Sequence, residues 1–480
     1  MISFTSSLLK LSLVCLICSL LNSLQVNVAW AETPEAIKEK LRLEIASNSA
    51  NELPIIIQFG AMNSLEERFQ KGSINLQVYQ TAMATQHTAL MSKLNRRNRP
   101  KGLRTFAATS HMAMHANVDE LEILLEDKTI RVFSDEPYDL MLAQSSARVY
   151  PTQNISEFHG NNQWTVAVID TGIDKNHPFL ADRVVSEACY SSNTISSTSL
   201  CPNGVTSSTA NGSGLPCDIS DSCNHGTQVA GIIAGNADDF DGIARQAQLI
   251  SIKVGSSQID PDSCAGGLTP CYGTTASEIL AALDRVYSLR NTFDIAAVNL
   301  SLATQTRFSG QCDDVRPETE IINRLTQARI AVVTAVGTSS DAGNLPSPAC
   351  ITNTISVAST FDTSDAPDVR NNTSEELDLF APGINIETST PGGGFVNTIG
   401  TSYAAPHVAA AMVVLREAAA PNVSVAQLVD LLKSVGPIVS QNSIDRRRLD
   451  ISAALMDVAF IVPDSIKVIP AILMLLLNED

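Results

Sequence analysis

The sequence predicts an α/β fold in which a doubly wound, mostly parallel sheet is flanked by helices and preceded by a small α+β unit. Four short apolar runs predict the strands, at residues 164–169, 249–254, 295–300 and 330–335. Strands that a parallel sheet buries on both faces are nearly continuous apolar runs. Helix-compatible segments at 276–289 and 318–328 separate the later runs. In such a fold the active site lies at the carboxyl ends of the strands.

The first residues have the pattern of a secretory signal. Lys10 precedes an apolar run at 11–21, and Ala29-Trp30-Ala31 supplies the small residues of a cleavage site before Glu32. A membrane anchor is the alternative, but the run is shorter than the ~20 residues that span a bilayer. We therefore expect residues 1–31 to be removed from an exported, extracellular or periplasmic protein.

The next segment, residues 32–143, mixes strand and helix patterns. Strands are expected at 54–59, 111–118 and 129–133, and helices at 62–95 and 120–125, the second with Asp119 as a possible cap. Such an alternation over about 100 residues predicts a small α+β sandwich. The six basic residues between Lys93 and Arg104 predict a solvated loop rather than a binding site.

Composition excludes several classes of protein. A net charge of −18 is unsuited to neutralising phosphates, so no nucleic-acid partner is expected. With 44% hydrophobic and 17% charged residues, the chain is neither wholly disordered nor a multi-span membrane protein.

The cysteines predict disulfides. After loss of the signal, eight remain, all between residues 189 and 350: Cys189, Cys201, Cys217, Cys223, Cys264, Cys271, Cys312 and Cys350. An even set in an exported chain indicates four bridges, and the short spacings favour Cys217–Cys223 and Cys264–Cys271. None of these eight belongs to a CxxC pair, so they do not suggest a metal site. The polar stretches 185–224 and 257–273 are expected to be surface loops that these bridges hold.

Three motifs stand where the fold would place a catalytic site. Asp170 follows the strand at 164–169, His225 precedes an apolar helix, and Ser402 follows Gly400-Thr401 at another helix start. Each has a structural alternative: a turn, a helix entrance or an N-cap. Together, in this order, they indicate nucleophilic catalysis, because a serine hydroxyl needs a neighbouring base to become a nucleophile.

With these motifs the sequence resembles the subtilisin-like serine protease family. The likeness covers roughly residues 160–420, and its three motifs are Val168 to Pro178, Asn224 to Gly231 and Gly400 to Ala409. The order Asp, His, Ser is that of the family. The resemblance implies that Ser402 is the nucleophile, that His225 is the general base and then acid, and that Asp170 orients the imidazole. It implies structural roles for Asp174 and His177.

The resemblance also gives residues 32–143 a role. They would be the family's prosegment, an intramolecular chaperone and inhibitor that is removed by autocleavage between Asp139 and Gln144. Residues 144–455 would then form the catalytic domain. The apolar tail at 456–480 contains a run too short to span a bilayer, and we expect it to pack against the body or a partner.

Two positions depart from the family pattern. Phe179 stands where many members have a calcium-binding aspartate, and because calcium needs oxygen ligands a structural calcium is not supported at this position, although one elsewhere stays open. No cofactor is expected to be required for catalysis. Thr338 stands where the family has its oxyanion-hole asparagine. Asn344 is a poor substitute, because it lies closer to Pro348 than the family spacing allows.

The sequence thus predicts a secreted, monomeric serine endopeptidase that acts on proteins or peptides and is inhibited by its own prosegment. A catalytically silent relative that serves as a binding module is the alternative, with Thr338 as its only support. A serine esterase of another fold would need a Gly-x-Ser-x-Gly motif and the order Ser, Asp, His, which this sequence lacks.

Overall fold

A computed structural model describes residues 34–47, 52–70, 73–94, 100–140, 158–237, 240–264, 267–458 and 461. The predicted signal peptide and most of the predicted tail at 456–480 lie outside these ranges. Among the described helices, none is long and apolar enough to cross a membrane.

The predicted parallel sheet is confirmed. Its parallel strands run in the order β22-β19-β18-β16-β13-β6-β10-β7. Their bounds are β6 Trp164–Asp170, β7 Val184–Tyr190, β10 Gln248–Val254, β13 Asp294–Leu300, β16 Ala331–Ala335, β18 Ile355–Phe361, β19 Leu379–Thr390 and β22 Ile444–Arg448. Antiparallel strands complete the sheet: β9 Ser207–Ser208, β20 Gly394–Ile399 and β21 Ile438–Gln441. All four apolar runs form strands of this sheet.

One predicted loop contains a strand instead. Residues 185–224 were expected at the surface because they are polar, yet β7 pairs in parallel with β10 and buries Ala188 and Cys189. The strand lies near the edge of the sheet, where it needs few apolar side chains. Part of the second polar stretch, 257–273, also belongs to strands, as described below.

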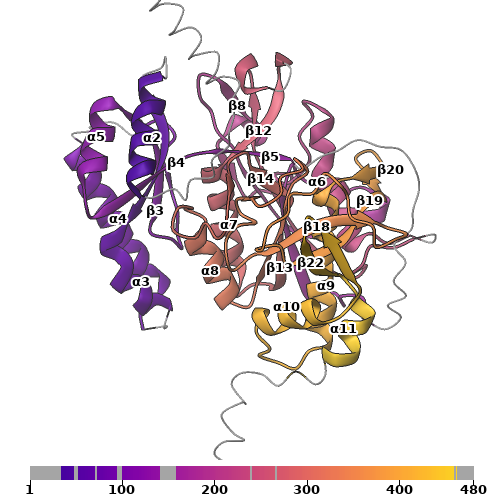
Figure 1. The fold of residues 1–480 in the computed structure, drawn as a ribbon. Coiled ribbons are helices and arrows are strands. Elements are labelled where there is room, and N and C mark those ends of the chain that lie inside the picture. Colours follow the sequence, from indigo (N-terminus) through magenta and orange to yellow (C-terminus); the bar gives the residue numbers. More distant parts are fainter. Residues whose placement is uncertain are drawn as a thin grey trace, which may run out of the picture.

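Helices cover both faces of the sheet (Figure 1). On one face lie α6 His225–Ala234, α9 Thr401–Ala418, α10 Val425–Ser434 and α11 Ile451–Val458, and on the other α7 Ala276–Leu289 and α8 Thr319–Gln327. Successive side chains of β6 pack on opposite faces of the sheet. Val166 and Val168 pack with the first group of helices, whereas Ala167 and Ile169 pack with the second. This alternation follows from the period of two along a strand.

The helix α9 is buried over nearly its whole length. Every residue from Thr401 to Arg416 is buried, and Ala404 to Leu415 are apolar apart from His407. A helix that is apolar all round has to be surrounded by other elements. Because Ser402 stands in its first turn, the tight packing of α9 fixes the position of that serine.

The amino-terminal segment folds as the expected α+β unit. Its antiparallel sheet has the order β2-β3-β1-β4, and helices flank it. The bounds are α2 Pro34–Ser47, β1 Glu52–Phe59, α3 Asn63–Gln70, α4 Leu76–Lys93, β2 Arg104–Thr105, β3 His111–Asn117, α5 Val118–Glu126 and β4 Ile130–Ser134.

Two details of this unit differ from expectation. The helix predicted at 62–95 is two helices, because the Asn75 side chain accepts a hydrogen bond from Val78 N (3.0 Å) and starts α4 anew. The cap of α5 is Asn117 rather than Asp119: Asn117 and Glu120 bond reciprocally in a capping box. Of the basic loop, residues 95–99 lie outside the described residues.

A short strand that the sequence did not predict joins the two parts of the chain. β5, Pro137–Leu140, lies between β12 Cys271–Thr275 and β14 Leu302–Thr304 and runs antiparallel to both. The same sheet continues through β11 Ser256–Gln258 and β8 Ser197–Ser199. Residues at the end of the amino-terminal segment thus become an inner strand, next to the edge, of a sheet of the main body.

All eight expected cysteines are paired. The bridges are Cys189–Cys201, Cys217–Cys223, Cys264–Cys271 and Cys312–Cys350. The two pairings favoured by their spacing are therefore confirmed. The other two close loops of 12 and 38 residues.

Removing the longest bridge should cost the most stability. Replacing both Cys312 and Cys350 by alanine is expected to lower the free energy of unfolding by about 4 kcal/mol, against about 2 kcal/mol for Cys264 and Cys271, because a longer loop gains more entropy in the unfolded chain. Guanidinium unfolding of the oxidised proteins measures both losses. Equal losses, or a larger one for the short loop, would contradict the ranking.

Candidate active site

Asp170 and His225 form a buried hydrogen-bonded pair. Asp170 is the last residue of β6, and His225 is the first residue of α6. His225 Nδ1 lies 2.8 Å from Asp170 Oδ1 and 2.9 Å from Oδ2, and both side chains are almost fully buried. Because a carboxylate only accepts, Nδ1 carries the proton, and the other ring nitrogen, Nε2, is the free basic position.

Close packing of two backbone segments makes this pair possible. The Thr171 hydroxyl accepts from Gly226 N (2.9 Å) and donates to Cys223 O (3.0 Å), so it connects the turn after β6 to the start of α6. A Cβ on Gly226 would stand 2.4 Å from Gly172 O. Only glycine at position 226 therefore allows the two segments to approach closely enough.

Ser402 lies at the start of α9, beside the carboxyl end of β13. Gly400, with φ of 144°, precedes the helix. The Ser402 hydroxyl donates to Ser301 O (3.2 Å), and the Ser301 hydroxyl donates to Ser402 O (2.8 Å). Asn299 Nδ2 in turn donates to the Ser301 hydroxyl (2.9 Å). The contacts between Ser301 and Ser402 bridge about a hundred residues and could not be read from the sequence.

The histidine and the serine are brought to the same place without a direct bond between their side chains. The ring of Tyr403, the residue after Ser402, lies 5.5 Å from the His225 ring, centroid to centroid. Within the described residues, His225 Nε2 has no hydrogen-bond partner. Catalytic hydrogen bonds are often long or misaligned until substrate binds.

Thr338 follows a strand whose end is held against the serine helix. Gly337 N donates to the Thr401 hydroxyl (3.0 Å), which places the residue before Thr338 beside the residue before Ser402. Asn372 braces the same loop: its amide donates to Val336 O (2.8 Å), and its oxygen accepts from the backbone N–H of Ser339 (3.1 Å). No sequence pattern had singled out Asn372, because its partners lie more than thirty residues away.

Asn344, which the sequence spacing made a poor substitute for the oxyanion-hole asparagine, bonds to a carboxylate. Asn344 Nδ2 donates to Asp341 Oδ1 (2.8 Å), and Asp341 also pairs with Arg307 (2.9 Å). The Asn344 amide is therefore engaged by the Asp341 carboxylate.

Phe179, at the position where many family members have a calcium-binding aspartate, belongs to an aromatic cluster. Phe179 is 3% exposed, and its ring packs against Phe240 and Phe395 at 4.8 and 5.3 Å. Carbon edges supply no oxygen ligand, so these residues do not fit a calcium ion. In the part of the chain that the structure describes, no group of three or more His, Cys, Asp or Glu side chains could hold a metal.

The contacts of Asp174 and His177 support structural roles. Asp174 Oδ2 accepts from Gly392 N (2.9 Å). His177 Nδ1 accepts from Phe179 N (3.1 Å), so Nε2 carries the proton and donates to Gly394 O (2.8 Å). A third histidine near the site, His407, donates through Nδ1 to Tyr403 O, and burial lowers its pKa to about 4. It is therefore neutral under ordinary conditions.

Comparison with protein families identifies one match. The pattern of the family described as "Subtilase family" matches residues 161–436. A relative named "Subtilisin-like protease 3" from Arthroderma benhamiae is 32% identical over 285 residues, which are 58% of this chain and 58% of the relative. An "Intracellular serine protease" from Paenibacillus polymyxa is 30% identical over 264 residues, 53% of this chain and 67% of the relative. The chain thus spans only part of the relatives it matches.

Two solved structures are also similar. One is a protease from Pseudoalteromonas arctica, with a TM-score of 0.49 and 22% identity over 63% of this chain and 91% of that chain. The other is a mutant protease domain of PatA, with a TM-score of 0.47 and 21% identity over 63% of this chain and 98% of that one.

Proposed function

This chain belongs to the subtilase family, and on that premise we propose that it is a secreted serine endopeptidase made as a zymogen that processes itself. The observation that carries the proposal is the buried hydrogen bond between Asp170 and His225. It leaves His225 Nε2 as the basic nitrogen of a ring whose centroid lies 5.5 Å from that of Tyr403, the residue after Ser402.

In this proposal the peptide bond is broken in two steps through an acyl-enzyme. His225 Nε2 takes the proton of the Ser402 hydroxyl as its oxygen attacks the scissile carbonyl carbon, and then gives that proton to the leaving amine. Water attacks the ester in the second step, and the same nitrogen again accepts and returns a proton. Asp170 keeps the required tautomer and stabilises the imidazolium, because its carboxylate faces Nδ1.

The negative oxygen of each tetrahedral intermediate needs hydrogen-bond donors. We assign one donor to the backbone N–H of Ser402 in the first turn of α9, where the helix dipole also favours negative charge. We assign the second to the Thr338 hydroxyl, directly or through a water molecule. The bond between Gly337 N and the Thr401 hydroxyl supports this placement.

The substrate would bind as an extended strand. β5 pairs antiparallel with β12 and β14, and an extended peptide can satisfy the same backbone groups by strand addition. β5 belongs to residues 32–143, which we propose to be the prosegment. The chain would therefore occupy its own substrate cleft as a product after cleavage between Asp139 and Gln144.

Charged contacts outside the cleft would hold the prosegment in place. Asp284, on α7, accepts hydrogen bonds from the backbone of Ala107 (3.0 Å) and Ala108 (2.5 Å). Glu320, on α8, accepts from Ser110 N (2.9 Å) and its hydroxyl (2.6 Å). Burial raises the pKa of Asp284 to about 6, so its carboxyl is ionised at pH 7.5 and the two bonds are charge-assisted.

Export and solution state belong to the same proposal. Four disulfides are typical of proteins that fold in an oxidising compartment, which supports a secreted enzyme. We propose that it acts on protein or peptide substrates as a monomer, without a cofactor. A silent binding module is the second candidate, and it is favoured only by Thr338 in place of the family's asparagine.

Replacing the nucleophile should stop both proteolysis and maturation. The Ser402→Ala protein is expected to remain unprocessed and to hydrolyse casein at least about 10⁴-fold more slowly, since one hydroxyl would serve both reactions. Gel analysis and amino-terminal sequencing of the purified protein measure this. A variant that still trims itself to the wild-type terminus would show that Ser402 is not the nucleophile.

The separately produced segment 32–143 should inhibit the mature enzyme, and Asp284 should contribute to that inhibition. Asp284→Ala is expected to raise the inhibition constant by tenfold or more, because two charge-assisted bonds to the Ala107 and Ala108 backbone are lost. Asp430→Ala, an exposed carboxylate on α10, is the matched control. No inhibition of the wild type at tens of micromolar would exclude the prosegment role.

Thr338 should limit the turnover number. Thr338→Asn is expected to raise kcat by up to about 10²-fold and Thr338→Val to lower it, because one oxyanion donor contributes about 10²–10³ in kcat. KM should change little. Thr363→Asn and Thr363→Val, at an exposed position away from the site, are the controls for hydrolysis of a chromogenic peptide. If neither Thr338 variant alters kcat, that side chain does not face the oxyanion.

A further inference from the structure

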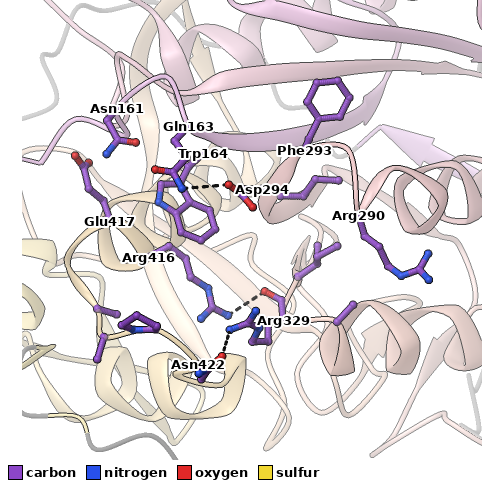
Figure 2. A pocket seen from close by; sticks show the side chains of 16 residues that line it. Asn161, Gln163, Trp164, Arg290, Phe293, Asp294, Arg329, Arg416, Glu417 and Asn422 are labelled. Carbon is purple, nitrogen blue, oxygen red and sulfur yellow. Dashed lines mark hydrogen bonds between the residues drawn. The ribbon is translucent and has the colours of Figure 1, made fainter. Parts of the chain in front are cut away.

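Figure 2 shows a cavity of about 450 Å³ at the amino-terminal ends of β6 and β13. It is lined by the residues that begin β6 and β13, by the turn before β16 and by the loop between α9 and α10. The candidate active site is at the carboxyl ends of the same strands. A strand of seven residues separates the two sites by about 20 Å. The cavity is therefore no part of the proposed catalytic machinery.

Three arginines line this cavity and supply its positive charge. Arg290, Arg329 and Arg416 line it, and none of them forms an ion pair within the described residues. Two carboxylates also line it, and each is hydrogen-bonded to a neutral donor rather than to an arginine: Asp294 accepts from Gln163 Nε2 (3.1 Å), and Glu417 accepts from Gly160 N (2.8 Å). In a chain with a net charge of −18, three arginines without a carboxylate partner are unexpected.

Arg416 is the least compensated of the three. It is 7% exposed, near the end of α9. Its Nη2 donates to Arg329 O (2.9 Å) and its Nη1 to Val423 O, but its Nε has no partner in the described part of the chain. Burial and the neighbouring Arg329 lower its pKa to about 10. A buried guanidinium is expensive unless a negative charge accompanies it.

Arg329 brings a second guanidinium to the same place. Its Nη1 donates to Asn422 Oδ1 (2.9 Å), and Figure 2 shows this group beside that of Arg416. Two like charges that approach each other repel unless an anion lies between them or close by. The third arginine, Arg290, is engaged elsewhere: its guanidinium stacks over the Tyr287 ring, 3.9 Å from the ring centroid.

We propose that this cavity binds a small oxyanion, a carboxylate or a phosphate, through Arg329 and Arg416. A guanidinium presents its donors as a planar fork that matches both anions. Trp164 and Phe293 add apolar side chains to the wall of the cavity, and the volume is within the range of small-molecule sites. Backbone carbonyls accept hydrogen bonds from two nitrogens of Arg416. They accept none from its Nε, and they do not balance the charge of the adjacent Arg329.

Calorimetric titration tests the proposal on the Ser402→Ala protein, so that the result does not depend on activity. Sodium phosphate and sodium succinate are titrated separately at pH 7.5, with ionic strength held constant by sodium chloride. We expect saturable one-site binding of at least one ion, and the two titrations distinguish phosphate from carboxylate. No saturable binding of either ion up to about 10 mM, a free energy weaker than about −3 kcal/mol, would overturn the proposal.

Variants locate the site. Arg329→Met should weaken binding by about tenfold, because it removes a charge-assisted donor, and Arg329→Lys should weaken it less. Arg329 is exposed, so both proteins should fold, which circular dichroism checks. Arg416→Met removes the buried charge as a second variant. Arg68→Met, at an exposed position on α3, is the matched control. Equal weakening by Arg68→Met, or none by Arg329→Met, would show that the anion binds elsewhere.

Discussion

The contact between the turn after β6 and the first turn of α6 determines the geometry of the candidate site. Thr171 bonds to both Gly226 and Cys223, and the Gly226 position tolerates no side chain against Gly172. Asp170 and His225 stand on either side of this contact. Their hydrogen bond therefore depends on backbone packing as much as on the two side chains themselves. A methyl group at position 226 would separate them without changing either residue.

The third predicted catalytic residue depends on a different element. α9 is surrounded by other elements over most of its length, and the contact between Ser301 and Ser402 ties its first turn to β13. A helix in such surroundings cannot shift without opening the core, because interiors are packed like crystals. The serine is thus positioned by the whole domain, whereas the aspartate and histidine are positioned locally.

The sequence predicted best what depends on local pattern. The four apolar runs form strands as expected, and the helix at 276–289 agrees to the residue. β7 and β5 were not predicted, because polar or short strands are recognised only by their partners, which lie far away in the chain. Motifs indicated Asp170, His225 and Ser402 as candidates. The bracing roles of Asn372 and Ser301 could not be predicted, because they arise from contacts between distant segments.

The place of β5 between β12 and β14 has a consequence for the kind of chain that the proposed protease could cut. If β5 left its place after the proposed cleavage, β12 and β14 would have a gap one strand wide between them, and only backbone without internal partners could fill it. A helix or a paired strand of a folded protein would have to unravel before it could enter. Local unfolding of the target, more than its side-chain sequence, would then decide which proteins are degraded, and compact neighbours would be spared.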